Sequence, residues 1–190
     1  MAEQAKRDAV VSSEAEQLIL VDANDEPVGY LDKAGCHDGE GILHRAFSLF
    51  IFDAQGRLLL QQRAPGKRLW PGYWSNSCCS HPRRHETMAQ AVQRRLHEEL
   101  GLRSDLDYLY KFTYHAAYGD LGSERELCWV YIGRGEGDPA VNRNEISAWR
   151  WITPDELDRE LAQNPEAFTP WLKLEWSRLR QEFMDRIQRL

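Results

Sequence analysis

The chain has 190 residues, of which 42% are hydrophobic and 28% charged, and its formal net charge is −6. This composition is typical of one soluble globular domain, and the acidic balance argues against binding to nucleic acid or to anionic membranes through a basic face. No apolar run approaches the roughly 20 residues that span a bilayer, and the polar N-terminus lacks the apolar core of a signal peptide, so we expect a cytoplasmic protein.

The first half of the chain alternates strand-like runs with turns. Residues 1–16 are polar, and we expect a flexible segment there, followed by a single domain over 17–190. "QLILVDANDEPVGYLDK" predicts two strands about a turn, and the glycine-rich "AGCHDGEGILH" predicts a loop that leads into a strand. "AFSLFIFD" and "RLLLQQR" flank a Gly-containing turn, which is typical of a β-hairpin.

The second half adds helices to further strands. "ETMAQAVQRRLHEELGL" predicts a helix over 88–100, "DYLYKFTYHAAY" and "ELCWVYIGR" predict strands, and "ISAWRWI" predicts a short strand with both Trp on one face. Two helices begin at Thr-Pro pairs, and the second continues as an amphipathic helix to the end of the chain. Strands around one helix, with helices at the end, predict an α+β fold, an α/β/α sandwich with a mixed sheet.

The helix over 88–100 carries a charge pattern that resembles the Nudix box, in which carboxylates on one helix face hold Mg²⁺ at a diphosphate. "RRLHEELGL" matches the end of that box, with two surface salt bridges as the alternative interpretation. The chain departs from the box at Ser80, where Gly is usual, and at Arg95, where the hydrolases carry a Glu that binds metal or activates water. A guanidinium removes a metal ligand and adds a phosphate clamp, which weakens the case for hydrolysis.

The stretch "SNSCCSHP" places two cysteines side by side. Disulfides are rare in the cytosol and no C-x-x-C pair is present, so we interpret these residues either as a reactive thiol or as small buried side chains. In an extended stretch Cys79 and His81 share a face, while Cys78 points away.

Five dispersed residues have the chemistry of a metal site. His37 and His44 flank the glycine-rich loop, His81 follows the cysteines, and "SERE" supplies Glu124 and Glu126 at a spacing of two. In a strand those two carboxylates point the same way. Three imidazoles and two carboxylates suit Mn²⁺, Mg²⁺ or Zn²⁺, and unrelated surface His and Glu are the alternative.

Together these motifs resemble the type 1 isopentenyl-diphosphate Δ-isomerases, a Nudix-fold family that uses no flavin. The resemblance covers roughly residues 17–175 and rests on "WPGYWSNSCCSHP", "EELGL", the His-x6-His pair, "SERE" and "FTPW". It implies an isomerase that interconverts isopentenyl and dimethylallyl diphosphate by protonating the alkene and deprotonating the adjacent carbon.

The resemblance also implies roles for individual residues. The ligands of one divalent metal, Mn²⁺, Mg²⁺ or Zn²⁺, are His37, His44, His81, Glu124 and Glu126. Glu99 helps to bind Mg²⁺ together with the substrate diphosphate, and the basic contacts to that diphosphate are Lys33, Arg63, Lys67 and Arg95. Cys79 and Glu126 form the acid–base pair, Tyr114 hydrogen-bonds in the site, and Trp171 faces the hydrocarbon. We favour Glu126, assisted by Tyr114, as the proton donor, and the sequence leaves the direction of transfer open.

Two other functions remain open from the sequence. One is a Nudix pyrophosphohydrolase, which shares the fold and Mg²⁺, and the other is a non-catalytic binding module in which the His and Glu residues hold a structural metal. We expect a small-molecule isoprenoid diphosphate as the substrate and neither nucleic acid nor membrane as a partner. The sequence leaves the oligomeric state open between a monomer and a weak dimer.

Overall fold

The computed structural model describes residues 8–190. Its strands are β1 (Gln17–Val21), β2 (Pro27–Asp32), β3 (His44–Phe52), β4 (Leu58–Arg63), β5 (Trp74–Ser75), β6 (Cys78–Ser80), β7 (Leu106–Ala117), β8 (Ser123–Arg134) and β9 (Ile146–Ile152). Its helices are α2 (Lys33–Cys36), α3 (Met88–Leu100), α4 (Pro154–Gln163), the 3₁₀ turn η1 (Pro165–Ala167), α5 (Pro170–Glu182) and α6 (Met184–Ile187).

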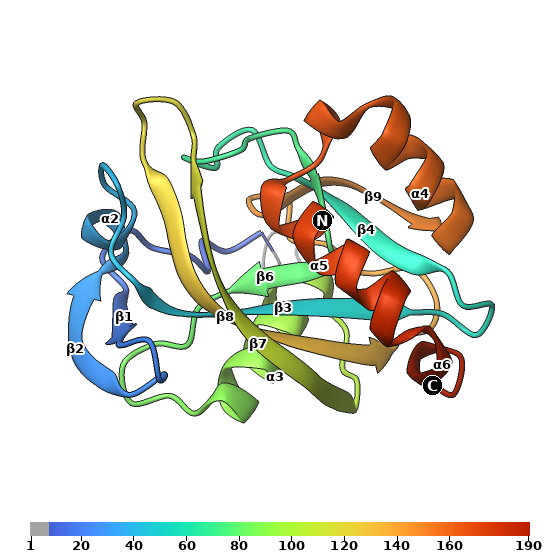
Figure 1. Ribbon diagram of the computed structural model, residues 1–190, viewed down its shortest axis with the longest axis horizontal. Helices are drawn as coiled ribbons and strands as arrows, with labels where there is room; N and C mark the ends of the chain where they lie inside the picture. Colours follow the sequence, from blue (N-terminus) through green and yellow to red (C-terminus); the bar gives the residue numbers. More distant parts are fainter. Residues whose placement is uncertain (1–7) are drawn as a thin grey trace.

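Strand β3 lies at the centre of a mixed sheet (Figure 1). It pairs antiparallel with β1, β4 and β6, and parallel with β8 along its whole length. On its other edge, β8 pairs antiparallel with β7, and β4 pairs antiparallel with β9. The predicted mixed sheet is therefore confirmed.

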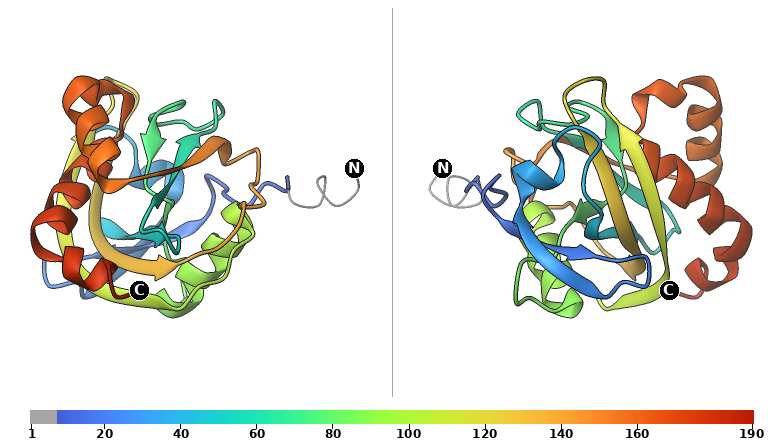
Figure 2. Two further views of the ribbon diagram at one scale, coloured as in Figure 1. Left: turned by 90° about the vertical axis from the view of Figure 1, so that its right-hand side faces the viewer. Right: turned by 60° about the vertical axis from the view of Figure 1, so that its left-hand side comes forward.

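The two faces of β3 belong to two hydrophobic cores. Phe47, Leu49 and Ile51 pack with the apolar face of α3, whereas Phe50 and Phe52 pack with residues of α4, α5 and α6. Alternate residues of a strand point to opposite faces, so one apolar run serves both layers. Figure 2 shows α3 on one side of the sheet and the C-terminal helices on the other, which confirms the predicted α+β sandwich.

Helix α3 begins and ends where the sequence predicted. The backbone N–H of Gln90 donates to the Thr87 hydroxyl at 3.3 Å, and the backbone N–H of Thr87 donates to the Gln90 side chain at 3.0 Å. Gly101 ends the helix in the left-handed region, with φ at 67°. The buried face of α3 contains Arg95 and Glu99 as well as apolar residues, so this helix carries charge into the interior.

Two predicted elements have different boundaries. The turn of the hairpin predicted from "AFSLFIFD" and "RLLLQQR" is present, but β3 and β4 share only the Phe52–Leu58 register pair. The reason is that β3 forms its long ladder with β8, and β4 forms its own ladder with β9. The predicted continuous C-terminal helix is interrupted at Phe183, whose ring stacks on Tyr110 at 5.4 Å. Packing of this partly buried ring against the core accompanies the end of the helix.

Residues 8–16, which we expected to be flexible, instead lie against the domain. The side-chain amide of Asn142 donates to the Ala9 carbonyl at 2.8 Å, and the Arg95 guanidinium donates to the Val11 carbonyl at 2.8 Å. The segment is held because its carbonyls accept hydrogen bonds from buried or half-buried donors. Residues 1–7 lie outside the described part of the chain. Over the described residues, none of the helices is long and apolar enough to cross a membrane.

Glu175 of α5 is a fully buried carboxyl group between the helix and the sheet. Its Oε1 accepts from the Cys128 thiol at 3.5 Å, and its Oε2 has no hydrogen-bond partner among residues 8–190. Burial raises the pKa of Glu175 to about 8, an effect that hydrogen bonds from Ser48 and Cys128 offset only in part. The group is therefore a neutral acid at neutral pH.

We expect Glu175→Gln to stabilise the protein increasingly as the pH rises. Between the ordinary carboxyl pKa of 4.5 and about 8, the unfolded chain ionises Glu175 while the folded chain keeps it protonated, so the parent loses stability over this window. At about 1.4 kcal/mol per pKa unit, the loss is on the order of 4 kcal/mol at pH 8. Urea unfolding of parent and variant at pH 5 and pH 8 measures this loss of unfolding free energy. If the two proteins differ in stability by the same amount at both pH values, the prediction is contradicted.

Candidate active site

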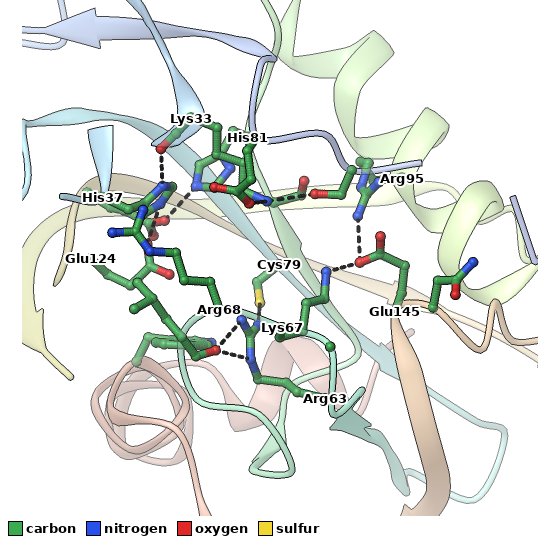
Figure 3. A pocket seen from close by; sticks show the side chains of 18 of the residues that line it. Lys33, His37, Arg63, Lys67, Arg68, Cys79, His81, Arg95, Glu124 and Glu145 are labelled. Carbon is green, nitrogen blue, oxygen red and sulfur yellow. Dashed lines mark hydrogen bonds and ion pairs between the residues drawn. The ribbon is translucent and has the colours of Figure 1, made fainter. Parts of the chain in front are cut away.

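One cavity of about 280 Å³ collects most of the residues that the sequence singled out (Figure 3). Its walls come from α2, the loop after β4, β6, α3, β7, β8 and α5. The predicted site residues that line it are Lys33, His37, Arg63, Lys67, Cys79, His81, Arg95, Tyr114, Glu124, Glu126 and Trp171. The other two, His44 and Glu99, lie behind this wall and contact Glu126 and Arg95.

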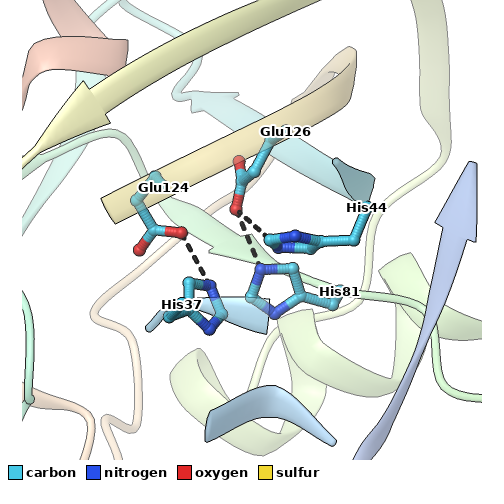
Figure 4. A group of neighbouring side chains, drawn as sticks. All are labelled: His37, His44, His81, Glu124 and Glu126. Atoms are coloured by element: carbon cyan, nitrogen blue, oxygen red, sulfur yellow. Dashed lines mark hydrogen bonds and ion pairs between the residues drawn. The ribbon is translucent and has the colours of Figure 1, made fainter. Parts of the chain in front are cut away.

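The three histidines and two glutamates form one buried cluster (Figure 4). One possible ligand atom from each residue lies within 4.8 Å of all the others, roughly twice a metal–ligand bond of about 2.0–2.3 Å. The parallel β3–β8 ladder sets His44 opposite Glu126. Strand β8 begins at Ser123 and so includes "SERE", as the metal-site prediction required. Glu124 and Glu126 therefore lie on one face of this strand.

The hydrogen bonds of this cluster prepare its imidazoles for a metal. The Nδ1–H of His37 donates to the Lys33 carbonyl and that of His44 to the Ile42 carbonyl, each at 2.7 Å. Each Nε2 therefore points into the cluster as the ligating nitrogen. His37 Nε2 lies 2.8 Å from Glu124 Oε2, and against the effect of burial the charge of Glu124 raises the pKa of His37, so a metal would take the place of a proton there. Proteins commonly orient a ligating histidine in this way, with one ring nitrogen held by a carbonyl and the other available to the metal. These residues fit a divalent cation.

His81 completes the set from the end of β6. Burial and the neighbouring His44 and His37 rings hold the pKa of His81 well below its usual value, so this imidazole is neutral, as a ligand must be. Its Nε2 lies 2.9 Å from Glu126 Oε1.

Glu126 also reaches the reactive wall of the cavity. The Tyr114 hydroxyl donates to Glu126 Oε2 at 2.6 Å, while Cys79, half-buried on β6, presents its thiol to the same cavity. Burial raises the pKa of Cys79 to about 12, and the Arg63 guanidinium, 4.0 Å from the sulfur, offsets this only partly. Cys78 points into the core beside α3, as the alternation predicted. The cavity thus joins a thiol, a phenol and a carboxylate.

Aromatic rings enclose the end of the cavity near the thiol. Trp171 is only 2% exposed, and its indole N–H donates to the Ser75 hydroxyl at 2.9 Å. Trp70 packs edge-on against it at 5.2 Å, and the Arg63 guanidinium lies 5.3 Å from its ring centroid. This hydrogen bond and these contacts fix the orientation of the indole.

Another part of the cavity wall is ionic. Arg95 is 2% exposed and donates to Glu99 at 2.5 Å, so the surface salt bridge considered for this pair is wrong. Sequence reasoning missed Glu145, at the loop before β9, which contacts both Lys67 and Arg95. Nothing in its sequence setting, "NRNEIS", links it to the box helix, because the contact depends on the folding of a loop.

Gly122, in the turn between β7 and β8, allows the turn to approach α2. Its φ is 144°, and a Cβ there would lie 2.2 Å from the His37 carbonyl oxygen, which accepts from Ser123 N–H at 3.0 Å. We expect Gly122→Ala to separate His37 from Glu124 and to weaken Mn²⁺ binding by about 10- to 100-fold, the effect typical of disturbed ligand support. Calorimetric titration measures this. Gly119→Ala, at positive φ but in open space, is the matched control, and equal affinities in the two variants would contradict the argument.

Comparisons with known proteins agree with this geometry. The NUDIX domain model matches residues 42–172. An "Isopentenyl-diphosphate Delta-isomerase 1" of Photorhabdus laumondii is 43% identical, and the match covers 90% of this chain and 99% of the relative. An "Isopentenyl-diphosphate Delta-isomerase" of Serratia proteamaculans is 49% identical over 82% of this chain and 87% of its own. A Deinococcus radiodurans crystal structure superposes with a TM-score of 0.65 and 27% identity, over 78% of this chain and 90% of that chain.

Proposed function

This chain belongs to the isopentenyl-diphosphate Delta-isomerase family of the Nudix fold, and from that premise we propose that it interconverts isopentenyl and dimethylallyl diphosphate. One observation carries the proposal. A single cavity joins a thiol and a hydrogen-bonded carboxylate at a metal-competent cluster to cationic side chains suited to a diphosphate. These are the parts that an isomerisation without a redox cofactor requires.

The reaction moves a carbon–carbon double bond by one position. Isopentenyl diphosphate has no carbonyl group that would acidify its protons, so the available route begins with protonation of the terminal alkene carbon. The new C–H bond leaves a tertiary cation, and loss of a proton from the adjacent methylene forms the new double bond. One proton enters and one leaves, which requires an acid and a base placed at different carbons.

We assign the two protons to Glu126 and Cys79. The resting site pairs a Cys79 thiol, whose pKa burial raises, with a Glu126 carboxylate, whose pKa is lowered against the effect of burial by hydrogen bonds. In the direction that forms dimethylallyl diphosphate, the thiol proton therefore first passes to Glu126. Glu126 with Tyr114 then donates to the alkene and the Cys79 thiolate accepts the methylene proton, and the roles exchange in the reverse direction. The 2.6 Å hydrogen bond from Tyr114 supports the first role because it places a second proton beside the carboxylate. The cavity-facing thiol of Cys79 supports the second.

The cationic intermediate needs stabilisation without capture by water. The ring of Trp171 offers a π face, worth about 0.5–2 kcal/mol to a desolvated cation. Trp70 and Tyr114 flank this ring, and both are buried. An aromatic enclosure excludes water that would convert the cation to an alcohol.

We further propose which residues hold cations. His37, His44, His81, Glu124 and Glu126 would hold one divalent metal, Mn²⁺, Mg²⁺ or Zn²⁺, and Glu99 would help to hold Mg²⁺ at the substrate. When bound, these ions supply positive charge that neutralises the diphosphate and fixes Glu126. The basic residues that complete the diphosphate site are Lys33, Arg63, Lys67 and Arg95. We propose a cytoplasmic enzyme that acts as a monomer or weak dimer.

The test is an NMR assay of isopentenyl diphosphate with Mg²⁺ and Mn²⁺ in D₂O. We expect dimethylallyl diphosphate that carries solvent deuterium, with no inorganic phosphate released. Release of phosphate or a monophosphate would instead establish a Nudix hydrolase and overturn the interpretation of Arg95 in the box. A protein that binds Mn²⁺ but leaves the substrate unchanged would favour the binding module.

A further inference from the structure

Glu145 is a buried carboxylate at the ionic part of the cavity wall, and the mechanism above does not use it. It is 3% exposed and lies at the end of a turn over residues 142–145. In that turn Asn142 N–H donates to the Glu99 carbonyl at 2.9 Å, and the Glu145 carbonyl accepts from Ala64 N–H at 2.9 Å. The turn therefore joins the end of α3 to the basic loop after β4.

The Glu145 carboxylate contacts two of the proposed diphosphate-binding cations (Figure 3). Its Oε2 contacts Lys67 Nζ and lies 3.3 Å from Arg95 Nη2. Arg95 has two further acidic partners, Glu98 at 3.4 Å and Glu99 at 2.5 Å. Among the described residues, the only ion pair of Lys67 is with Glu145. Lys67 therefore depends on Glu145 more than Arg95 does.

The surroundings of Lys67 oppose its positive charge. Burial lowers the pKa of Lys67 below its usual value, and the charges of Arg63 on β4 and Lys33 on α2 lower it further. Glu145 and, from α3, Glu99 act in the other direction, with Glu145 the stronger of the two. Without the Glu145 charge, the balance shifts toward the neutral amine.

We propose that Glu145 is a positioning residue for diphosphate binding, because it keeps Lys67 charged and aims Lys67 and Arg95 into the cavity. This inference rests on the proposed function, in which the ionic part of the cavity wall receives the diphosphate. Glu145 acts through Lys67 and Arg95. A neutral Lys67 would leave the diphosphate with one cation fewer, and the penalty would grow as the pH rises.

Glu145→Gln tests the inference through the pH dependence of KM. We measure KM and kcat for isopentenyl diphosphate over a series of pH values. The ratio of the variant's KM to the parent's KM should rise with pH, by up to about tenfold per pH unit as Lys67 loses its proton, with kcat at saturation within about twofold. Glu145→Asp, which keeps the charge, should not show this slope. Adding Lys67→Arg to Glu145→Gln should remove the slope, because a guanidinium stays protonated.

Binding of inorganic pyrophosphate with Mg²⁺, followed by calorimetry over the same pH range, separates this inference from the function. If the parent does not isomerise isopentenyl diphosphate but the variant shows the pH-dependent loss of pyrophosphate binding, the function fails and the positioning role stands. If the variant loses affinity equally at every pH, or loses only kcat or melting temperature, Glu145 is merely structural and the inference is overturned.

Discussion

Replacement of Cys79 by alanine is expected to lower kcat for isopentenyl diphosphate by about a hundredfold to ten-thousandfold while leaving the fold and the metal site intact. A positioned acid or base typically contributes about 10²–10⁴-fold to a rate, and alanine offers neither. The Cys79 side chain is only half-buried, and within residues 8–190 the one polar contact of its thiol is the weak 4.0 Å approach of Arg63. The turnover assay, thermal unfolding and the bound-metal content together measure the outcome.

Cys78 provides a matched control one residue away. It is fully buried in the core beside α3, outside the cavity. Cys78→Ala should therefore cost about 1–2 kcal/mol of stability, as the loss of a small buried side chain does, and keep kcat. If Cys79→Ala keeps its turnover, Cys79 is not the acid–base partner of Glu126, and the binding-module interpretation gains support.

Removal of divalent metal is expected to abolish turnover and to lower the melting temperature by about 10 °C. The Glu124 and Glu126 carboxylates and three imidazoles lie against one another in the interior, so an ion that binds only the folded cluster stabilises it. At a free metal concentration about 1,000 times Kd this amounts to about 4 kcal/mol, and each kcal/mol moves the melting temperature by about 2–4 °C at this chain length.

The experiment compares thermal unfolding and activity before chelation, after it, and after Mn²⁺ is added back. His44→Ala, which removes a ligand, should make the melting temperature insensitive to chelation, whereas His97→Ala, at an exposed position of α3, should respond like the parent. A parent protein that melts at the same temperature with and without metal would refute the ligand assignment for the five-residue cluster.

Local sequence signals predicted the parts of the fold that local chemistry determines. The Thr87–Gln90 capping box and Gly101 are sufficient to begin and end α3, and the two-residue spacing of Glu124 and Glu126 is sufficient to place both on one face of a strand. The resemblance to known isomerases then related residues that are distant in the sequence. Most of the residues that the resemblance relates to one another line the same cavity.

The features that the sequence could not predict depend on contacts between residues that are far apart in the chain. The turn after β3 predicts a hairpin, but the choice between β4 and β8 as the main partner of β3 depends on which strand covers a surface that is apolar on both sides. Glu145 meets Lys67 only because a distant turn folds beside the basic loop. Residues 8–16 look polar and unstructured, yet their carbonyls accept bonds from donors more than 70 positions away.

The parallel pairing of β3 with β8 also constrains when the metal cluster can form during folding. Ser48 and Cys128, on these two strands, lie 80 positions apart, and loop closure over such a separation is entropically slow. All three imidazoles of the cluster precede β8, and both carboxylates lie on it, so a nascent chain presents only three of the five ligands until that ladder closes. We therefore expect ion binding to follow the closure of the β3–β8 ladder. Bound metal should therefore lengthen the lifetime of the native state without accelerating its formation.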